Sequence, residues 1–130
     1  MNLQLARSIL FAKDMSRLTA FYGDSLGLSV LQSEFPPDEW VEFAAGSCNF
    51  ALHRIPNPWA ADVEIEDPPV VRQGAPTKLV FRVEDLEAAR ATLKQRGVTE
   101  LDPGVINAPG ERVRCDFVDP EGNVFQLSTR

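Results

Sequence analysis

The sequence is poor in histidine and cysteine, the residues that most often build metal sites and nucleophilic sites. Its 130 residues include one histidine, His53, and two cysteines, Cys48 and Cys115. A single histidine excludes any site that needs two from one chain. The cysteines stand too far apart for a CxxC motif, and two cysteines make no disulfide framework. We expect reduced thiols in a cytoplasmic protein; a catalytic thiolate, the alternative, would lack a neighbouring histidine.

The sequence also lacks an excess of positive charge and any long apolar run. The net charge is -6 and the isoelectric point is about 4.7, which disfavours a general nucleic-acid binder. No stretch reaches the ~18 apolar residues that span a bilayer. In the first residues, MNLQLARSILFAKD, Arg7 and Asp14 interrupt the apolar side chains, so no signal peptide is expected. We therefore expect neither nucleic-acid nor membrane partners.

What the sequence does contain is typical of one globular domain, with 44% hydrophobic and 25% charged residues. Five of the ten prolines fall within residues 56–76, which are also acidic, and this composition predicts a linker. Within it, residues 62–67 (DVEIED) have two interpretations. They form a solvated linker, or a short edge strand or arm that docks on a second subunit.

The first half of the chain predicts one strand, one helix and three further strands. Period-two alternation predicts a strand over 3–12, and Asp14 or Ser16 then caps a helix that ends at Gly27. Further strands are expected at 28–33, 39–45 and 48–55. The helix would pack its regularly spaced apolar side chains in the core: Met15, Leu18, Phe21, Tyr22 and Leu26.

The second half repeats this order of elements. Strands are predicted at 77–83, 98–101, 112–118 and 123–129, with a helix over 86–96 that Asp85 caps. Pro103-Gly104 and residues 119–122 (DPEG) are predicted turns. Aligning the halves places Lys78 on Arg7 and Gln126 on Ala51. Each half is too short for a comfortable core of its own, so pairing two halves would bury their open sheet faces.

Three strings in this repeat resemble the vicinal oxygen chelate superfamily, which includes glyoxalase I and the fosfomycin-resistance, bleomycin-resistance and extradiol dioxygenase proteins. They are SILFAKDMSRLTAFYGDSLGL, VEFAAGSCNFALH and FVDPEGNVFQL. The resemblance implies an α+β fold and a homodimer. Residues 1–130 would form one domain, with βαβββ modules at 1–55 and 77–130 and the linker 56–76 between them. The modules would form a U-shaped, partly open mixed sheet with the helices outside.

In metal-dependent members of that superfamily, each half supplies one ligand from its first strand and one from its last. The resemblance places these positions at Arg7 and Ala51, and at Lys78 and Gln126. Arginine and lysine offer no lone pair, alanine has no donor atom, and one glutamine amide does not hold an ion against water. We therefore expect no metal and no other cofactor; a divalent metal is the minority alternative.

Two cations at the base of such a cup need a counter-charge. In one interpretation Arg7 and Lys78 pair with internal carboxylates, for which Glu42 and Asp116 are the candidates. In the other they hold the carboxylate or phosphate of a ligand. Arg114 shares a strand face with Asp116, and either pairs with it or adds to the positive charge.

His53 is either a packed strand residue or an acid–base group with a pKa near neutrality. Trp40, on the adjacent predicted strand, offers an aromatic wall for a planar ligand. The candidate ligand-binding residues are therefore Arg7, Trp40, Glu42, His53, Lys78, Arg114 and Gln126.

Three functions remain open from the sequence. The first is metal-free binding of an anionic or aromatic small molecule, as in the bleomycin-resistance proteins. The second is a glyoxalase-type lyase or isomerase that uses His53, Glu42 or Gln126 with an atypical metal site or acid–base chemistry alone. The third is a structural or regulatory dimer that binds no ligand.

Overall fold

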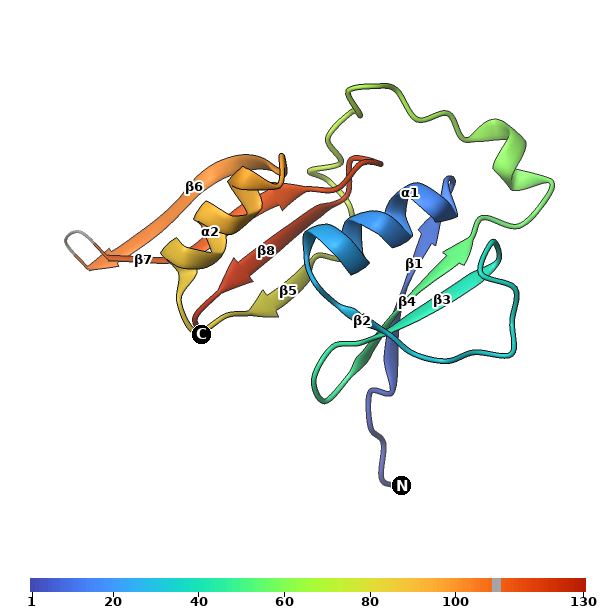
Figure 1. Ribbon diagram of the computed structural model, residues 1–130, viewed down its shortest axis with the longest axis horizontal. Helices are drawn as coiled ribbons and strands as arrows, with labels where there is room; N and C mark the ends of the chain where they lie inside the picture. Colours follow the sequence, from blue (N-terminus) through green and yellow to red (C-terminus); the bar gives the residue numbers. More distant parts are fainter. Residues whose placement is uncertain (109–110) are drawn as a thin grey trace. The chain divides into compact units, whose positions relative to one another are not determined.

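The computed structural model describes residues 1–108 and 111–130, and the side chains of residues 1–101 and 113–130. The chain divides into two compact units, Met1–Ile65 and Glu66–Arg130. Each unit holds one helix against a four-stranded mixed sheet (Figure 1). The predicted α+β class and the two tandem βαβββ modules are confirmed. The single domain over 1–130, with modules at 1–55 and 77–130, stays a prediction.

The first unit contains β1 (Arg7–Ala12), α1 (Met15–Ala20), β2 (Ser29–Val30), β3 (Trp40–Ala44) and β4 (Asn49–Arg54). The sheet order is β1-β4-β3-β2, with β1 parallel to β4 and the other pairs antiparallel. Asp14 caps α1 by accepting a hydrogen bond from the Arg17 N–H. A π-helical turn (Phe21–Ser25) extends α1, and Gly27 then takes the left-handed conformation expected of a helix stop.

The core of the first unit is an aromatic cluster between α1 and the sheet. Phe43 and Phe50 face each other across β3 and β4 and stack with ring centroids 5.8 Å apart. Tyr22 meets the Phe50 ring edge-on at 4.7 Å. Leu18 and Leu52 are fully buried beside these rings. The aromatic pair in the helix therefore packs in the core, as the helical spacing predicts.

The second unit contains β5 (Leu79–Arg82), α2 (Leu86–Gln95), β6 (Thr99–Ala108), β7 (Glu111–Val118) and β8 (Val124–Ser128). The sheet order is β5-β8-β7-β6, so β5 takes the place that β1 has in the first unit. Asp85 caps α2 through the Ala88 N–H, and Gly97 ends it in the left-handed conformation. Phe117 and Phe125 stack at 5.6 Å, which repeats the pair at the centre of the first core.

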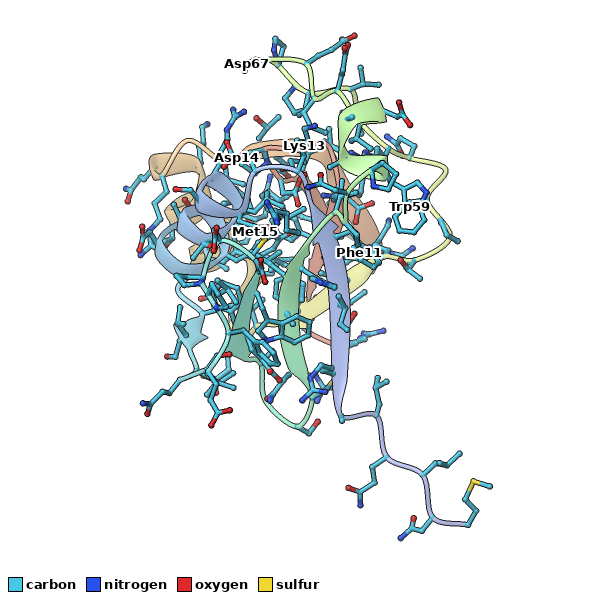
Figure 2. All side chains as sticks on the ribbon, turned by 90° about the vertical axis from the view of Figure 1, so that its right-hand side faces the viewer. Phe11, Lys13, Asp14, Met15, Trp59 and Asp67 are labelled. Carbon is cyan, nitrogen blue, oxygen red and sulfur yellow. The ribbon has the colours of Figure 1, made fainter. Side chains whose placement is uncertain are left out.

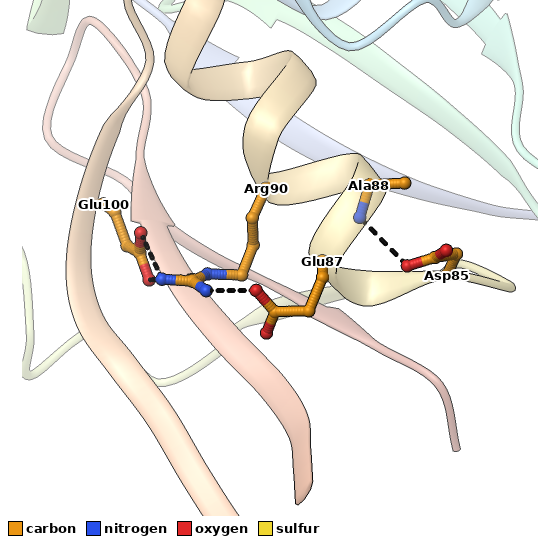
Figure 3. Close-up of polar contacts among 5 residues, drawn as sticks. All are labelled: Asp85, Glu87, Ala88, Arg90 and Glu100. Atoms are coloured by element: carbon orange, nitrogen blue, oxygen red, sulfur yellow. Dashed lines mark hydrogen bonds and ion pairs between the residues drawn. The ribbon is translucent and has the colours of Figure 1, made fainter. Parts of the chain in front are cut away.

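An ion pair between Arg90 and Glu100 joins α2 to its sheet. Both oxygens of Glu100 on β6 accept hydrogen bonds from Arg90 at 2.8–3.0 Å, and Glu87 accepts a further one at 2.7 Å (Figure 3). Burial acts to lower the pKa of Arg90, but these bonds and the charge of Glu100 raise it above its ordinary value.

The turn predicted at Pro103-Gly104 is wrong, because both residues lie inside β6. This strand is an edge strand, where a missing proline N–H leaves no ladder partner unpaired. Instead of a turn, this part of β6 shows shifts in its register against β7, between Glu100 and Asp102 and between Asp102 and Val105. Two other predicted strands are shorter than expected, since residues 3–6 and 31–33 lie outside β1 and β2.

The linker 56–76 contains one short 3-10 helix, Trp59–Asp62, and no strand, so residues 62–67 do not form the edge strand of one interpretation. Lys13 at the end of β1 donates a hydrogen bond to the Ala60 carbonyl. Figure 2 shows Phe11 on the first strand, Lys13 directly after it and Trp59 on this short helix. Within the described ranges, no helix is long and apolar enough to cross a membrane.

Candidate functional site

Side-chain alternation gives the first sheet one face covered by α1 and one open face. On β1, Ser8, Leu10 and Ala12 point toward the covered side and are less exposed than their neighbours. Arg7, Ile9 and Phe11 are all exposed. Because the side-chain period of a strand is two, the open face continues through alternate residues of β4 and β3.

Three rings form a row across this open face, which we call the aromatic row: Phe11, His53 and Trp40. The three residues are direct neighbours in the register of β1, β4 and β3. The His53 ring lies 5.4 Å from Phe11 and 5.6 Å from Trp40, measured between centroids. Phe35 extends the row at 6.3 Å from Trp40. Phe11 is 54% exposed, so the row presents ring surface outward.

A charged cluster lies next to the row on the same face. Arg7 Nε and Asn49 Nδ2 both donate to Oε1 of Glu42, at 3.0 and 2.9 Å. The Asn49 hydrogen bond, followed by the bond and the charge of Arg7, holds the pKa of Glu42 below its ordinary value, although burial acts to raise it. The Glu42 carboxylate is therefore a partner of Arg7 rather than a base poised near neutral pH.

The open face of the second sheet carries a cluster of the same composition. Lys78 Nζ donates to Oδ2 of Asp116 at 2.8 Å, and Gln126 Nε2 donates to Oδ1 at 2.8 Å. In both units a cation at the start of the first strand or directly before it pairs with a carboxylate on the third strand, and this carboxylate also accepts a hydrogen bond from an amide on the fourth. Arg7 and Lys78 thus make the ion pairs with internal carboxylates that one of the two interpretations requires.

Arg114 does not pair with Asp116. It lies on β7 opposite Ser128 of β8, and Ser128 lies opposite Arg82 of β5. Both arginines are exposed. Among the side chains that the structure describes, neither arginine makes an ion pair. The structure thus places the seven predicted site residues in three groups: Arg7 with Glu42, Trp40 with His53, and Lys78 with Gln126, while Arg114 stands apart from these.

The four positions that the resemblance assigns to metal ligands do not fit a metal ion here. In the first unit they are Arg7, already bound to Glu42, and Ala51, which has no donor atom. In the second unit they are Lys78, bound to Asp116, and Gln126, whose amide donates to the same carboxylate. An ammonium or guanidinium group within 3.0 Å of each carboxylate would repel a divalent ion. Across the described residues, no group of three or more His, Cys, Asp or Glu side chains is placed to bind a metal.

Sequence reasoning missed Phe11, Asn49 and Arg82. Phe11 lies at period two from Arg7, which is a usable signal, but its contact with His53 depends on the register of a parallel pair far apart in sequence. Asn49 stands two residues before Ala51 and therefore shares its face. Arg82 stands four residues after Lys78 on the same strand face, and this spacing could have identified it.

The family model of the Glyoxalase/Bleomycin resistance protein/Dioxygenase superfamily matches residues 4–127. The chain belongs to this superfamily, as the strings in both halves predict. Among curated proteins, none matches by sequence.

Solved structures with the same fold cover almost the whole chain. The structure of UcmS2 is 22% identical with a TM-score of 0.75, and each chain is covered completely. TnmS3, described as an antibiotic binding protein from Streptomyces sp. CB03234, is 25% identical with a TM-score of 0.66, over 98% of this chain and 95% of that chain. FosX, a fosfomycin resistance protein from Listeria monocytogenes solved with Mn(II) and 1S,2S-dihydroxypropylphosphonic acid, is 17% identical with a TM-score of 0.69, over 99% and 91%.

Proposed function

We propose that this protein binds a small planar aromatic molecule on the aromatic row of the first sheet, without a metal ion and without transforming the ligand. The observation that carries the proposal is the alignment of Phe11, His53 and Trp40 in one register row with ring surface exposed. A planar ligand laid on this row would remove ring surface from water on both sides and gain offset or edge-to-face contacts.

The neighbouring groups of the same face support binding rather than chemistry. Glu42 is held ionised by Arg7 and Asn49, so it is unsuited to accept a proton near neutral pH. His53 lies between the rings of Phe11 and Trp40, where its imidazole serves as a third flat surface. A metal-dependent lyase or isomerase would need ligands at positions that hold Arg7, Ala51 and Lys78.

The relatives give support of the same kind. TnmS3, which has this fold and is 25% identical to the chain, is described as an antibiotic binding protein. FosX was solved with Mn(II), but the metal positions described above carry other residues in this chain. Loss of metal donors together with an exposed aromatic row favours the binding role.

The test uses 2-naphthalenemethanol, an uncharged planar probe, titrated by calorimetry into the full chain. Trp40 also supplies a fluorescence signal, with Trp59→Phe as the background that leaves it the only tryptophan. We expect binding to weaken about tenfold in Phe11→Ala and in His53→Ala, because each removes one contact surface. Val80→Ala is the matched control, since Val80 is also 54% exposed but lies on the second sheet.

Binding that is equally strong in Phe11→Ala, His53→Ala and Val80→Ala would overturn the placement on the aromatic row. No binding of the wild-type protein to 2-naphthalenemethanol or to other bicyclic aromatic probes would overturn the function itself and favour the ligand-free dimer. Thermal unfolding of each variant checks that the fold is retained.

We also infer that the chain forms a homodimer in the cytoplasm. Leu3 and Leu5 are 81% and 74% exposed and lead into β1, which is an edge strand of its sheet. Apolar side chains beside an unpaired strand edge favour association. The two cysteines are free thiols, as expected in a reducing compartment. Light scattering at micromolar concentration tests the dimer, and a monomer would contradict it.

A further inference from the structure

We infer that the ligand of the aromatic row carries a positive charge, as a planar aromatic cation or as an aromatic ring that bears an ammonium group. This inference rests on the proposed binding function and adds the charge of the ligand to it. The charged group would lie at the end of the row formed by Trp40 and Phe35, whose ring centroids are 6.3 Å apart. Phe35 is 64% exposed, so a ligand in solution has access to its ring.

The loop that carries Phe35 is held by hydrogen bonds on both sides of this residue. Before it, the Ser33 hydroxyl accepts a hydrogen bond from the Phe35 N–H at 3.1 Å. After it, the Pro36 carbonyl accepts hydrogen bonds from the N–H groups of Glu39 and Trp40, at 2.9 and 3.0 Å. Proline also fixes its own φ. The ring of Phe35 therefore stands beside Trp40 before a ligand binds, which lowers the entropic cost of binding.

The exposed rings favour a cation over an anion of the same shape. An aromatic ring has a negative potential over its face, which attracts a cation within about 6 Å of the centroid, and tryptophan attracts it most strongly. The row offers Trp40 together with Phe11 and Phe35, and both phenylalanines are more than half exposed. The same potential repels an anion that approaches the ring faces.

Two carboxylates stand close to this end of the row. Glu34 directly precedes Phe35, and Asp38 stands two residues before Trp40. Two residues span at most about 7 Å of chain, which is less than the screening length of ~8 Å at physiological salt. Both carboxylates are exposed, and among the described side chains neither makes an ion pair. Their negative charge adds to the attraction that the rings exert on a cation.

The cations of the first sheet are already paired with carboxylates. Arg7 pairs with Glu42, and Arg54 pairs with Glu39 at 3.7 Å. The open face of β1, β3 and β4, strands that the structure describes in full, has no further Lys, Arg, Asp or Glu side chain. The first unit as a whole has four basic and eight acidic residues, a formal charge of -4. Its field therefore attracts a small cation and repels an anion.

The test compares three probes that share a naphthalene ring and differ in charge: (2-naphthylmethyl)trimethylammonium, 2-naphthalenemethanol and 2-naphthylacetate. Each is titrated by calorimetry into the full chain. We expect the cation to bind about tenfold more tightly than the alcohol, and the anion to bind more weakly than the alcohol. Raising the NaCl concentration to about 0.3 M should reduce the difference between the cation and the alcohol, because salt screens the carboxylates.

Variants of the loop separate the effect of charge from that of ring surface. Glu34→Gln and Asp38→Asn should each weaken binding of the cation about threefold and leave the Kd of the alcohol unchanged, because the alcohol has no charge. Phe35→Leu should weaken binding of the cation more than that of the alcohol, since leucine is apolar but has no ring face.

Asp24→Asn is the matched control for these variants. Asp24 is exposed on the π-helical turn that extends α1, on the covered side of the same sheet. The substitution removes the same charge from the same unit at a distance from the row, so it should leave the Kd of all three probes unchanged. Equal weakening of the cation in Asp24→Asn and Asp38→Asn would overturn the assignment to this end of the row.

The three probes also distinguish this inference from the function on which it rests. Equal Kd values for the cation and the alcohol, or tightest binding of the anion, would overturn the positive charge of the ligand and leave the aromatic row as a binding site. Failure of all three probes to bind would overturn the proposed function and the charge of its ligand together.

Discussion

Arg7 and Glu42 form an ion pair across the first sheet, with 3.0 Å between Arg7 Nε and Glu42 Oε1. Lys78 and Asp116 form its counterpart in the second sheet at 2.8 Å. In each unit the pair joins the first strand to the third across the strand between them. Each sheet therefore pairs a cation with a carboxylate that also accepts a hydrogen bond from a side-chain amide, Asn49 in the first sheet and Gln126 in the second.

The Glu42 carboxylate should contribute stability that the folded chain loses in acid. Its pKa is lower in the folded chain than the ~4.3 expected when unfolded, so the folded state binds fewer protons. This stabilisation is fully present above the unfolded pKa and is lost as pH falls through the lower folded pKa. In urea unfolding measured from pH 6 to about 3, Glu42→Gln should lose less stability than wild type.

Glu34→Gln is the control for that series, because it makes the same change of charge at an exposed residue outside any described ion pair. It should keep the wild-type slope below pH 5. The same slope in wild type, Glu42→Gln and Glu34→Gln would mean that Arg7 and Asn49 do not hold the Glu42 carboxylate in solution.

The second prediction compares two glycines with similar backbone conformations. Gly122 has φ +86° and Gly46 has φ +82°. A Cβ at Gly122 would lie 2.0 Å from the Val70 carbonyl oxygen, whereas at Gly46 it would meet nothing within 4 Å. Gly46→Ala should cost about 1 kcal/mol in free energy of unfolding, the ordinary penalty of a left-handed residue.

Gly122→Ala should cost several times more than Gly46→Ala, because the backbone at Val70 must move and the hydrogen bond from Arg72 N to Gly122 O, 2.8 Å long, is disturbed. Chemical denaturation of both variants gives the comparison. Equal penalties would show that the linker residues 70–72 do not pack on the 119–122 turn in solution.

The third prediction concerns Arg90, which joins α2 to β6. Its side chain is 21% exposed, and it binds both oxygens of Glu100. Arg90→Met should lower the free energy of unfolding by about 1–2 kcal/mol, since Glu100 then loses its charged partner. Arg90→Lys should recover only part of this loss, because lysine lacks the fork that reaches two oxygens.

Lys94→Met serves as the surface control for Arg90, with an expected change within about 0.5 kcal/mol. If Arg90→Met lay in that same range, the ion pair would be too hydrated to contribute.

The elements that could be predicted from the sequence are those with local causes. Asp14 and Asp85 cap their helices through side-chain oxygens three residues away, and Gly27 and Gly97 end them by left-handed backbone geometry. Both causes are visible within a few residues of sequence. The turn at Pro103-Gly104 was wrong because an edge strand tolerates a proline, and strand order is not a local property.

The candidate site was only partly predictable, for the same reason. Trp40 and His53 were paired through a short hairpin, but the third ring, Phe11, joins them through the parallel pairing of β1 and β4. The ion pairs of Arg7 and Lys78 likewise depend on which carboxylates the sheet register brings beside them. Such relationships follow from packing rather than from the spacing of residues in the chain.

The central claim is that the aromatic row binds a planar ligand without a metal ion. The most direct measurement is calorimetric titration of 2-naphthalenemethanol into wild type and Phe11→Ala, each with and without EDTA. We predict a wild-type Kd that EDTA leaves unchanged and that Phe11→Ala weakens about tenfold. Loss of binding in EDTA, or an unchanged Kd in Phe11→Ala, would contradict the account.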